Sequence, residues 1–142
     1  MENPKKSLQE YYEQLKGIDE DFKRAEFFPP VSYEQIEHFE KENNMQIPES
    51  YKNWLFLSNG GYLIGGSVQL FGIYNDPEPY VGYDYTKGLV PKEYLILWSF
   101  ESDVICFDKK SMKYFFYRYS DKSVDYDDFN EILDFIIDVC TN

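Results

Sequence analysis

Histidine and cysteine, the side chains that most often bind transition metals, are scarce: the 142 residues include one histidine and two cysteines. A zinc site with two histidine ligands is therefore impossible, and Cys106 and Cys140 form no Cys-x-x-Cys unit that could replace it. His38 could act as a general base, but its position in a helical pattern is more typical of a solvated histidine. We expect two buried free thiols, with no bound metal, no cofactor and no catalytic residue.

Long apolar runs are also absent. No stretch approaches the ~20 apolar residues that a membrane-spanning helix needs. Lys5 and Lys6 form a positive pair near the N-terminus, but no apolar run follows it, so the pattern of a signal peptide is missing. Two unpaired thiols fit a reducing compartment. These features together predict a cytoplasmic protein.

Positive charge is in short supply. Asp and Glu total 26 against 14 Lys and Arg, which gives a formal net charge of −12. Such a field repels nucleic acid and attracts a basic partner. An acidic surface that only maintains solubility is the alternative explanation. Neighbouring carboxylates, such as Asp125 with Asp127, could serve a glycosidase or bind a cation. Because 26 acidic residues create such neighbours by chance, an enzyme is the least favoured hypothesis.

Aromatic side chains are abundant, with 14 Tyr and 12 Phe. Most of them should pack in the core, but several tyrosines alternate with acids in the Pro-containing segment 75–85. We predict a long loop there, with room for an edge strand at its end, and loops of this length often carry function. The predicted partner-binding residues are Asp76, Glu78, Tyr80, Tyr83, Asp84 and Tyr85. The alternative is an ordinary connection whose rings cover the sheet edge.

Helical patterns lie towards both ends of the chain and strand patterns lie in the middle. Helices are predicted from Leu8 to Leu15, where Gly17 can end the helix, from Ser32 to Asn44 with a capping box of Ser32 and Gln35, and near the C-terminus after Asp125. Apolar runs over 68–74, 94–100, 104–107 and 114–119 predict strands. This order predicts an α+β fold in which N-terminal helices and a C-terminal helix pack on a central antiparallel β-sheet.

The segment from Ile47 to Gly61 has the clearest local pattern. Pro48 suits the first position of a short helix, and Asn59 with the two glycines after it tolerates positive φ and can end one. At least one of the glycines should have positive φ. The residues that we assign to this structural motif are Ile47, Pro48, Tyr51, Trp54, Leu55, Asn59, Gly60 and Gly61.

This motif resembles the central motif of the SUKH superfamily, which includes Smi/Knr-type cell-wall assembly regulators and many bacterial immunity proteins. The resemblance extends from about Phe27 to Val139 and includes Leu70-Phe71-Gly72, a strand ending at Asp108 and the closing helical segment. The sequence departs from the family pattern at 101–103, where Glu-Ser-Asp replaces Gly-Asp-Gly-type residues. The resemblance implies a single domain over 1–142, with an N-terminal helical extension at 1–28 and a core at 29–140.

The resemblance also implies a function in binding. Immunity proteins of this superfamily neutralise toxins, often nucleases with basic substrate channels, and an acidic protein rich in tyrosine suits such a channel. The leading hypothesis is therefore a non-enzymatic immunity protein for a cognate toxin, with no nucleic acid or membrane partner. The second is a Smi/Knr-like regulatory scaffold that binds a signalling partner or a small carbohydrate-type ligand.

Overall fold

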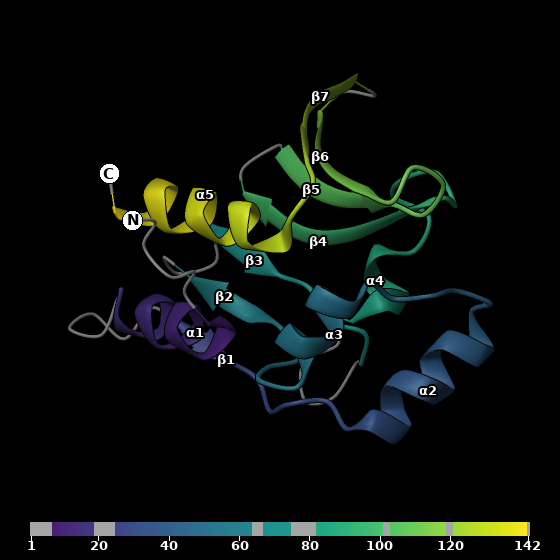
Figure 1. Cartoon of the computed structure of the whole chain (residues 1–142), viewed down its shortest axis with the longest axis horizontal. Coiled ribbons are helices and arrows are strands. Elements are labelled where there is room, and N and C mark those ends of the chain that lie inside the picture. Colours follow the sequence, from purple (N-terminus) through teal and green to yellow (C-terminus); the bar gives the residue numbers. More distant parts are fainter. Residues whose placement is uncertain are drawn as a thin grey trace, which may run out of the picture.

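The computed structural model describes residues 7–18, 25–63, 67–74, 82–100, 103–118 and 121–141. Helices and strands follow one another in the order α1 (Leu8–Gly17), β1 (Glu26–Phe27), α2 (Tyr33–Glu42), α3 (Glu49–Leu55), β2 (Gly61–Leu63), β3 (Val68–Leu70), α4 (Tyr83–Thr86), β4 (Tyr94–Phe100), β5 (Asp103–Asp108), β6 (Lys113–Arg118), β7 (Asp121–Tyr126) and α5 (Phe129–Thr141). Figure 1 shows their arrangement.

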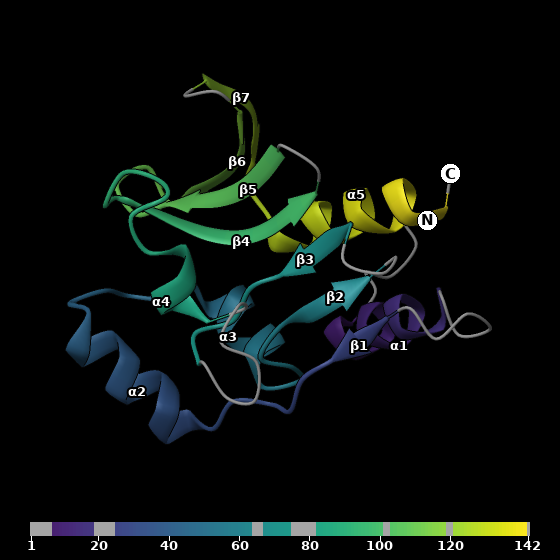
Figure 2. The same cartoon turned by 180° about the vertical axis from the view of Figure 1, so that it is seen from behind.

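The seven strands of this part of the chain form one sheet in sequence order, β1 to β7, and every neighbouring pair is antiparallel. Helices α1, α3 and α5 lie on one side of the sheet, as the two opposite views show (Figures 1 and 2). The predicted α+β fold, with N-terminal helices and a C-terminal helix packed on an antiparallel sheet, is confirmed.

The main core lies between these helices and the sheet, and aromatic rings dominate its centre. Trp54 of α3 lies 5.9 Å from Trp98 of β4 and 6.2 Å from Phe129 of α5, measured between ring centroids. All three side chains are buried. The same cluster includes Tyr11 and Leu15 of α1, so the described N-terminal residues share one core with the rest of the chain. Each large ring removes much apolar surface from water, which stabilises the fold.

The opposite face of the sheet carries a smaller apolar cluster of Phe71, Ile96, Cys106 and Phe115. Ile96 pairs with Cys106 across β4 and β5, and Cys106 pairs with Phe115 across β5 and β6, so the three side chains form a row. The register shifts by one residue after Ile96. This bulge is why Leu97 and the next residue both belong to the main core.

Three short strands were not predicted. The two-residue β1 is too short to show alternation, and β2 begins inside the glycine motif. β7 occupies 121–126, between the predicted strand over 114–119 and the last helix, and it includes Asp125, the expected cap of that helix. That expectation was wrong: α5 begins at Phe129, and the Asp128 carboxylate accepts a hydrogen bond of 3.1 Å from the Asn130 amide.

Two local predictions also need correction. An edge strand was considered at the end of segment 75–85, but the described residues 83–86 form the short helix α4. The helix over 49–55 ends four residues before Asn59, and Pro48 occupies its N-cap position rather than its first turn.

Both cysteines are free as expected, but only Cys106 is buried, because Cys140 is partly exposed. Burial raises the pKa of Cys106 to about 12, which keeps this thiol protonated.

Gly60 and Gly61 allow a direct test of the glycine motif. Their φ angles are 98° and 151°, and a Cβ atom would clash with the Leu70 carbonyl at Gly60 and with the Glu26 carbonyl at Gly61. We expect Gly60→Ala and Gly61→Ala each to lower the free energy of unfolding by roughly 3 kcal/mol, because strain and a backbone clash add. Denaturant unfolding measures this.

Gly88 supplies the matched control. Its φ of 91° is also positive, but a Cβ atom there has no neighbour within 4 Å. Gly88→Ala should therefore cost only the strain, about 1 kcal/mol. Equal losses at all three glycines would contradict the role of the close backbone contacts.

Buried tyrosines predict a loss of stability at high pH. Burial raises the pKa of Tyr11 to about 12, with a further contribution from its hydrogen bond to Asp134, and burial also raises the pKa of Tyr51 and Tyr114. An unfolded tyrosine loses its proton near pH ~10. The stability that these phenols contribute is therefore complete below about pH 10 and is lost as pH rises towards about 12.

Unfolding at pH values from about 8 to 11 measures this effect. Tyr11→Phe should weaken the decline in unfolding free energy above about pH 10, because it removes one of the groups that must ionise. Tyr33→Phe is the control, since the Tyr33 side chain is 68% exposed. A decline weakened equally by both substitutions would contradict the assignment to buried phenols.

Candidate binding groove

A groove lies where α2, α4 and the chain after β3 meet. It has two adjoining compartments, which we call the acidic compartment and the lysine compartment. The acidic compartment has a volume of about 530 Å³ and is lined by Gln35, His38, Phe39, Glu42 and Asn43 of the α2 region, by Ile73 and Tyr74, and by Tyr83, Asp84 and Lys87. Helix α2 forms one outer border of the molecule in both overall views (Figures 1 and 2).

The lysine compartment has a volume of about 600 Å³ and lies towards β4 and the end of β5. It shares Glu42, Asn43, Tyr83 and Lys87 with the acidic compartment, so the two adjoin. Its further lining residues are Asn44, Thr86, Gly88, Val90, Pro91, Lys92, Tyr94, Ile96 and Lys109. Volumes of this size are typical of sites for small ligands.

The Asn59 side chain fixes one wall of the acidic compartment. Its Oδ1 accepts hydrogen bonds from the backbone amides of Ile73 (3.0 Å) and Tyr74 (3.2 Å), and its Nδ2 donates to the Tyr74 carbonyl (2.6 Å). Asn59 is buried, so these bonds are shielded from water. A Cβ atom on Gly72 would clash with Asn59, and only glycine allows this close approach. The Asn59 side chain therefore supplies hydrogen bonds that a neighbouring strand would otherwise make to Ile73 and Tyr74.

A ring contact docks α4 against α2. Tyr83 and Phe39 meet edge to face with ring centroids 5.0 Å apart. Burial raises the pKa of Tyr83, with a smaller contribution from the neighbouring Asp84 carboxylate, so the phenol remains neutral at physiological pH. Thr86 is buried, and its hydroxyl donates to the Tyr83 carbonyl at 3.1 Å. A four-residue helix is marginal alone, so these contacts hold it in place.

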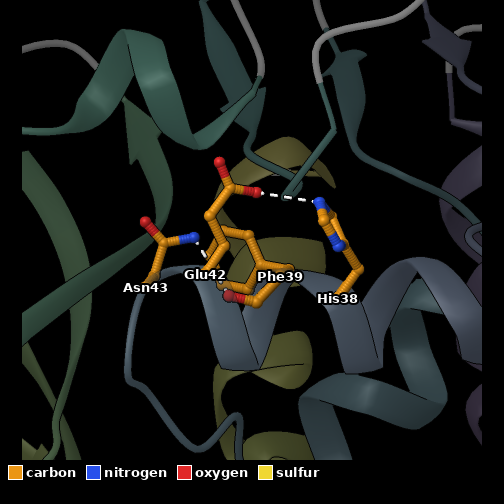
Figure 3. A network of polar contacts seen from close by, with 4 residues as sticks. All are labelled: His38, Phe39, Glu42 and Asn43. Atoms are coloured by element: carbon orange, nitrogen blue, oxygen red, sulfur yellow. Dashed lines mark hydrogen bonds and ion pairs between the residues drawn. The ribbon is translucent and has the colours of Figure 1, made fainter.

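The α2 side of the groove carries a polar network (Figure 3). His38 and Glu42, one helical turn apart, form an ion pair of 3.0 Å when the histidine is protonated, and their side chains are 79% and 66% exposed. Asn43 donates from Nδ2 to the Phe39 carbonyl at 3.0 Å and helps to end the helix. The solvated helical histidine expected from the sequence is confirmed. An exposed pair of this kind adds little stability, about 0–1 kcal/mol.

The predicted partner-binding residues divide into two groups. Asp76, Glu78 and Tyr80 lie outside the described residues. The other three lie on α4: Tyr83 and Asp84 line the groove, whereas Tyr85 is 48% exposed and its ring lies 6.4 Å from that of Phe71. The structure thus brings Tyr83 and Asp84 together with residues of α2.

Sequence reasoning missed the contribution of α2 and the role of the Asn59 side chain. His38, Phe39 and Glu42 were assigned only to an amphipathic helix, because nothing local shows which distant segment faces them. Asn59 was assigned only to a helix end. One signal could have suggested more. A helix needs only one residue that tolerates positive φ at its end, whereas Asn59 and the two glycines after it supply three.

The other residues of the structural motif belong to the core. Ile47, Tyr51, Trp54 and Leu55 are buried. The Tyr51 hydroxyl donates to the Phe71 carbonyl at 2.5 Å, which ties α3 to the chain just after β3. Together with Asn59, this bond fixes the position of the segment that forms the groove wall.

No group of three or more histidine, cysteine or acidic side chains suited to a metal occurs among the residues that the structure describes. In the same residues, no helix is long and apolar enough to cross a membrane. The described lining of the groove consists of aromatic rings, apolar side chains, amide groups and charges of both signs.

Residues 30–134 match the model of the SMI1 / KNR4 family (SUKH-1). This range includes α2, α3, the glycine motif, the groove and the first part of α5. A comparison with curated proteins finds no match.

Asn59 provides a test of how the groove wall is held. Asn59→Ala should lower the free energy of unfolding by roughly 2–4 kcal/mol, because it leaves buried backbone groups of Ile73 and Tyr74 without partners. Asn43→Ala, which removes one hydrogen bond within the end of a helix, should cost about 1 kcal/mol or less. Denaturant unfolding of both variants is the measurement, and similar losses would contradict the special role of Asn59.

Proposed function

Because the chain belongs to the SMI1 / KNR4 family (SUKH-1), we propose that it is a non-enzymatic binding protein, namely an immunity protein that neutralises a cognate toxin domain by direct contact. The family is generally non-catalytic. The groove supports this proposal, because it offers side chains suited to recognition. The observation that carries it is the exposed surface of tyrosines and carboxylates beside α4.

Tyr74 and Tyr85 are the tyrosines of this surface. Their side chains are 42% and 48% exposed, whereas most large aromatic side chains of the described chain are buried or half-buried. Exposed tyrosines favour protein recognition, since each offers a large apolar ring and a hydroxyl while losing little conformational freedom. Tyr74 lines the groove together with Asp84 of α4 and Glu42 of α2, and Tyr85 follows Asp84 on α4.

The charge of the chain favours a basic partner. A formal net charge of −12 accelerates encounter with a positive surface and opposes binding of nucleic acid. A nuclease toxin has a basic channel for its substrate, which gives a protein of this charge a complementary target. Complementary charge chiefly raises the association rate, while buried aromatic anchors chiefly slow dissociation.

A second function, a Smi/Knr-like regulatory scaffold, is supported by the lining of the acidic compartment. Phe39, Tyr74 and Tyr83 supply rings on which a sugar can stack, and Gln35 and Asn43 supply amide groups for its hydroxyls. A small carbohydrate-type ligand would fit the volume of about 530 Å³. The scaffold would then signal through a partner that recognises the occupied groove.

Binding kinetics test the first function, with the toxin domain encoded by the adjacent gene as the partner. We expect association to slow as salt rises from about 0.05 to 0.3 M, because salt screens exposed charges. Asp84→Lys should slow association by roughly tenfold, and Tyr74→Ala should mainly speed dissociation, at a cost of roughly 2 kcal/mol. Surface-based binding measurements give both rate constants.

Glu13→Lys is the matched control, since Glu13 lies on α1, away from the groove, and the change in net charge is the same. An equal effect of Asp84→Lys and Glu13→Lys would exclude α4 as the contact surface. No association with the toxin domain, together with saturable binding to an oligosaccharide, would favour the second function.

A further inference from the structure

The lysine compartment has an excess of positive charge within an acidic protein. Lys87, Lys92 and Lys109 all line it. Elsewhere, Lys41, Lys52 and Lys113 lie within 4 Å of carboxylates, and Lys16 lies over the Tyr12 ring. Lys110 is exposed and lies outside the groove. No ion pair joins any of the three groove lysines to another described residue. With 26 acidic residues in the chain, three unpaired lysines around one groove need an explanation.

The three lysines come from different parts of the chain, and backbone hydrogen bonds fix the wall that carries them. Lys87 follows α4, Lys92 precedes β4 and Lys109 follows β5. The bonds run from the Leu89 amide to the Thr86 carbonyl (3.1 Å), from the Tyr94 amide to the Pro91 carbonyl (3.0 Å) and from the Lys109 amide to the Glu93 carbonyl (2.9 Å). A fixed wall reduces the entropic cost of binding a ligand.

The Lys109 side chain is partly buried, so its ammonium group has lost part of its hydration. Partial burial lowers its pKa, the Glu93 carboxylate opposes that shift, and the positive charge of Lys92 adds to it. An anion bound between the two lysines would replace lost hydration and remove their mutual repulsion. Glu42, on the α2 side, is the one carboxylate among the described lining residues.

The rest of the compartment is suited to the uncharged part of a small molecule. Val90, Pro91, Tyr94 and Ile96 give it apolar and aromatic surface, and Asn43 adds an amide group. A volume of about 600 Å³ fits a ligand of the size of a nucleotide. A long polyanion would meet the negative field of the whole protein, whereas a small anion is governed by the nearest charges.

We propose that the lysine compartment is a binding site for a phosphorylated small molecule. Lys92 and Lys109 hold the phosphate, Lys87 closes the site from α4, and the organic part lies against Tyr94 and Ile96. Lysine binds phosphate as a point charge, so three of them suit a group with two or more negative charges. This site goes beyond the toxin-binding function and stands independently of it.

Calorimetric titration of the full chain at an ionic strength of about 0.15 M tests the proposal. The probes are inorganic pyrophosphate, which has the charge alone, and ADP, which adds an aromatic base and a sugar. We expect saturable binding of both at one site, with ADP tighter because its base and sugar also contact the apolar wall. ADP binding no tighter than pyrophosphate would overturn the assignment of the organic part.

Lys92→Gln and Lys109→Gln should each weaken binding by about tenfold or more, because each removes a charged donor. Lys110→Gln is the matched control, because the substitution changes the net charge by the same amount. Lys110 is exposed and does not line the groove. This substitution should change affinity by about twofold or less. If Lys109→Gln lowers the melting temperature of the free protein, the exposed Lys92 still gives the comparison.

Three outcomes would overturn the proposal. The first is the absence of saturable binding for both probes up to millimolar concentration. The second is an equal loss in Lys92→Gln and Lys110→Gln, which would indicate only diffuse attraction of anions. The third is tighter binding of polyglutamate than of ADP, which would assign the lysines to an acidic protein segment.

Discussion

The hydrogen bonds of one buried amide fix one wall of the candidate binding groove. The Asn59 side chain satisfies three backbone groups of a segment that has left the sheet after β3. Without this amide, the segment would either need a strand partner or expose its polar groups to a groove lined partly by aromatic rings. Glycine at position 72 is a condition for the contact, since a side chain there would occupy the space of the amide. In the sequence, Asn59 suggests only a turn. In the structure, its side chain joins the end of the α3 region to the segment after β3.

One face of the sheet carries the main core, and the other face borders the lysine compartment. Trp54, Trp98 and Phe129 pack on the helix-covered face and account for much of the buried apolar surface. The other face has a smaller apolar cluster, and Tyr94 and Ile96 on that side also line the lysine compartment. Lys87 and Lys92 are exposed and Lys109 is only partly buried, so substitutions of these lining lysines should cost little stability.

The sequence predicted those elements whose signals are local. The capping box of Ser32 and Gln35 and the apolar stripe of the C-terminal helix specify their helices directly, and both helices form. The strands β1 and β2 have two and three residues, too few for a periodic pattern, and they exist only because other segments pair with them.

The groove could be predicted only in part. Tyr83 and Asp84 were found from composition, because a segment rich in tyrosine and acid is unusual. The whole of β4 and β5 separates Lys92 from Lys109 in the sequence. Only the register of these two strands places both lysines at one end of the sheet. The structural role of Asn59 depends in the same way on the position of Ile73, which no local pattern specifies.

The order of strands also bears on self-association. Among the residues that the structure describes, β1 and β7 each pair with one strand only and so form the two edges of the sheet, and an exposed edge is a template for pairing with other chains. Here one edge is only two residues long, which offers few backbone groups to a neighbour. The sequence of the other edge strand includes Asp121, Lys122 and Asp125, and charges of this kind discourage strands from stacking edge to edge. The same meander that builds the binding groove therefore resists growth into fibres, even though 20% of its residues are aromatic.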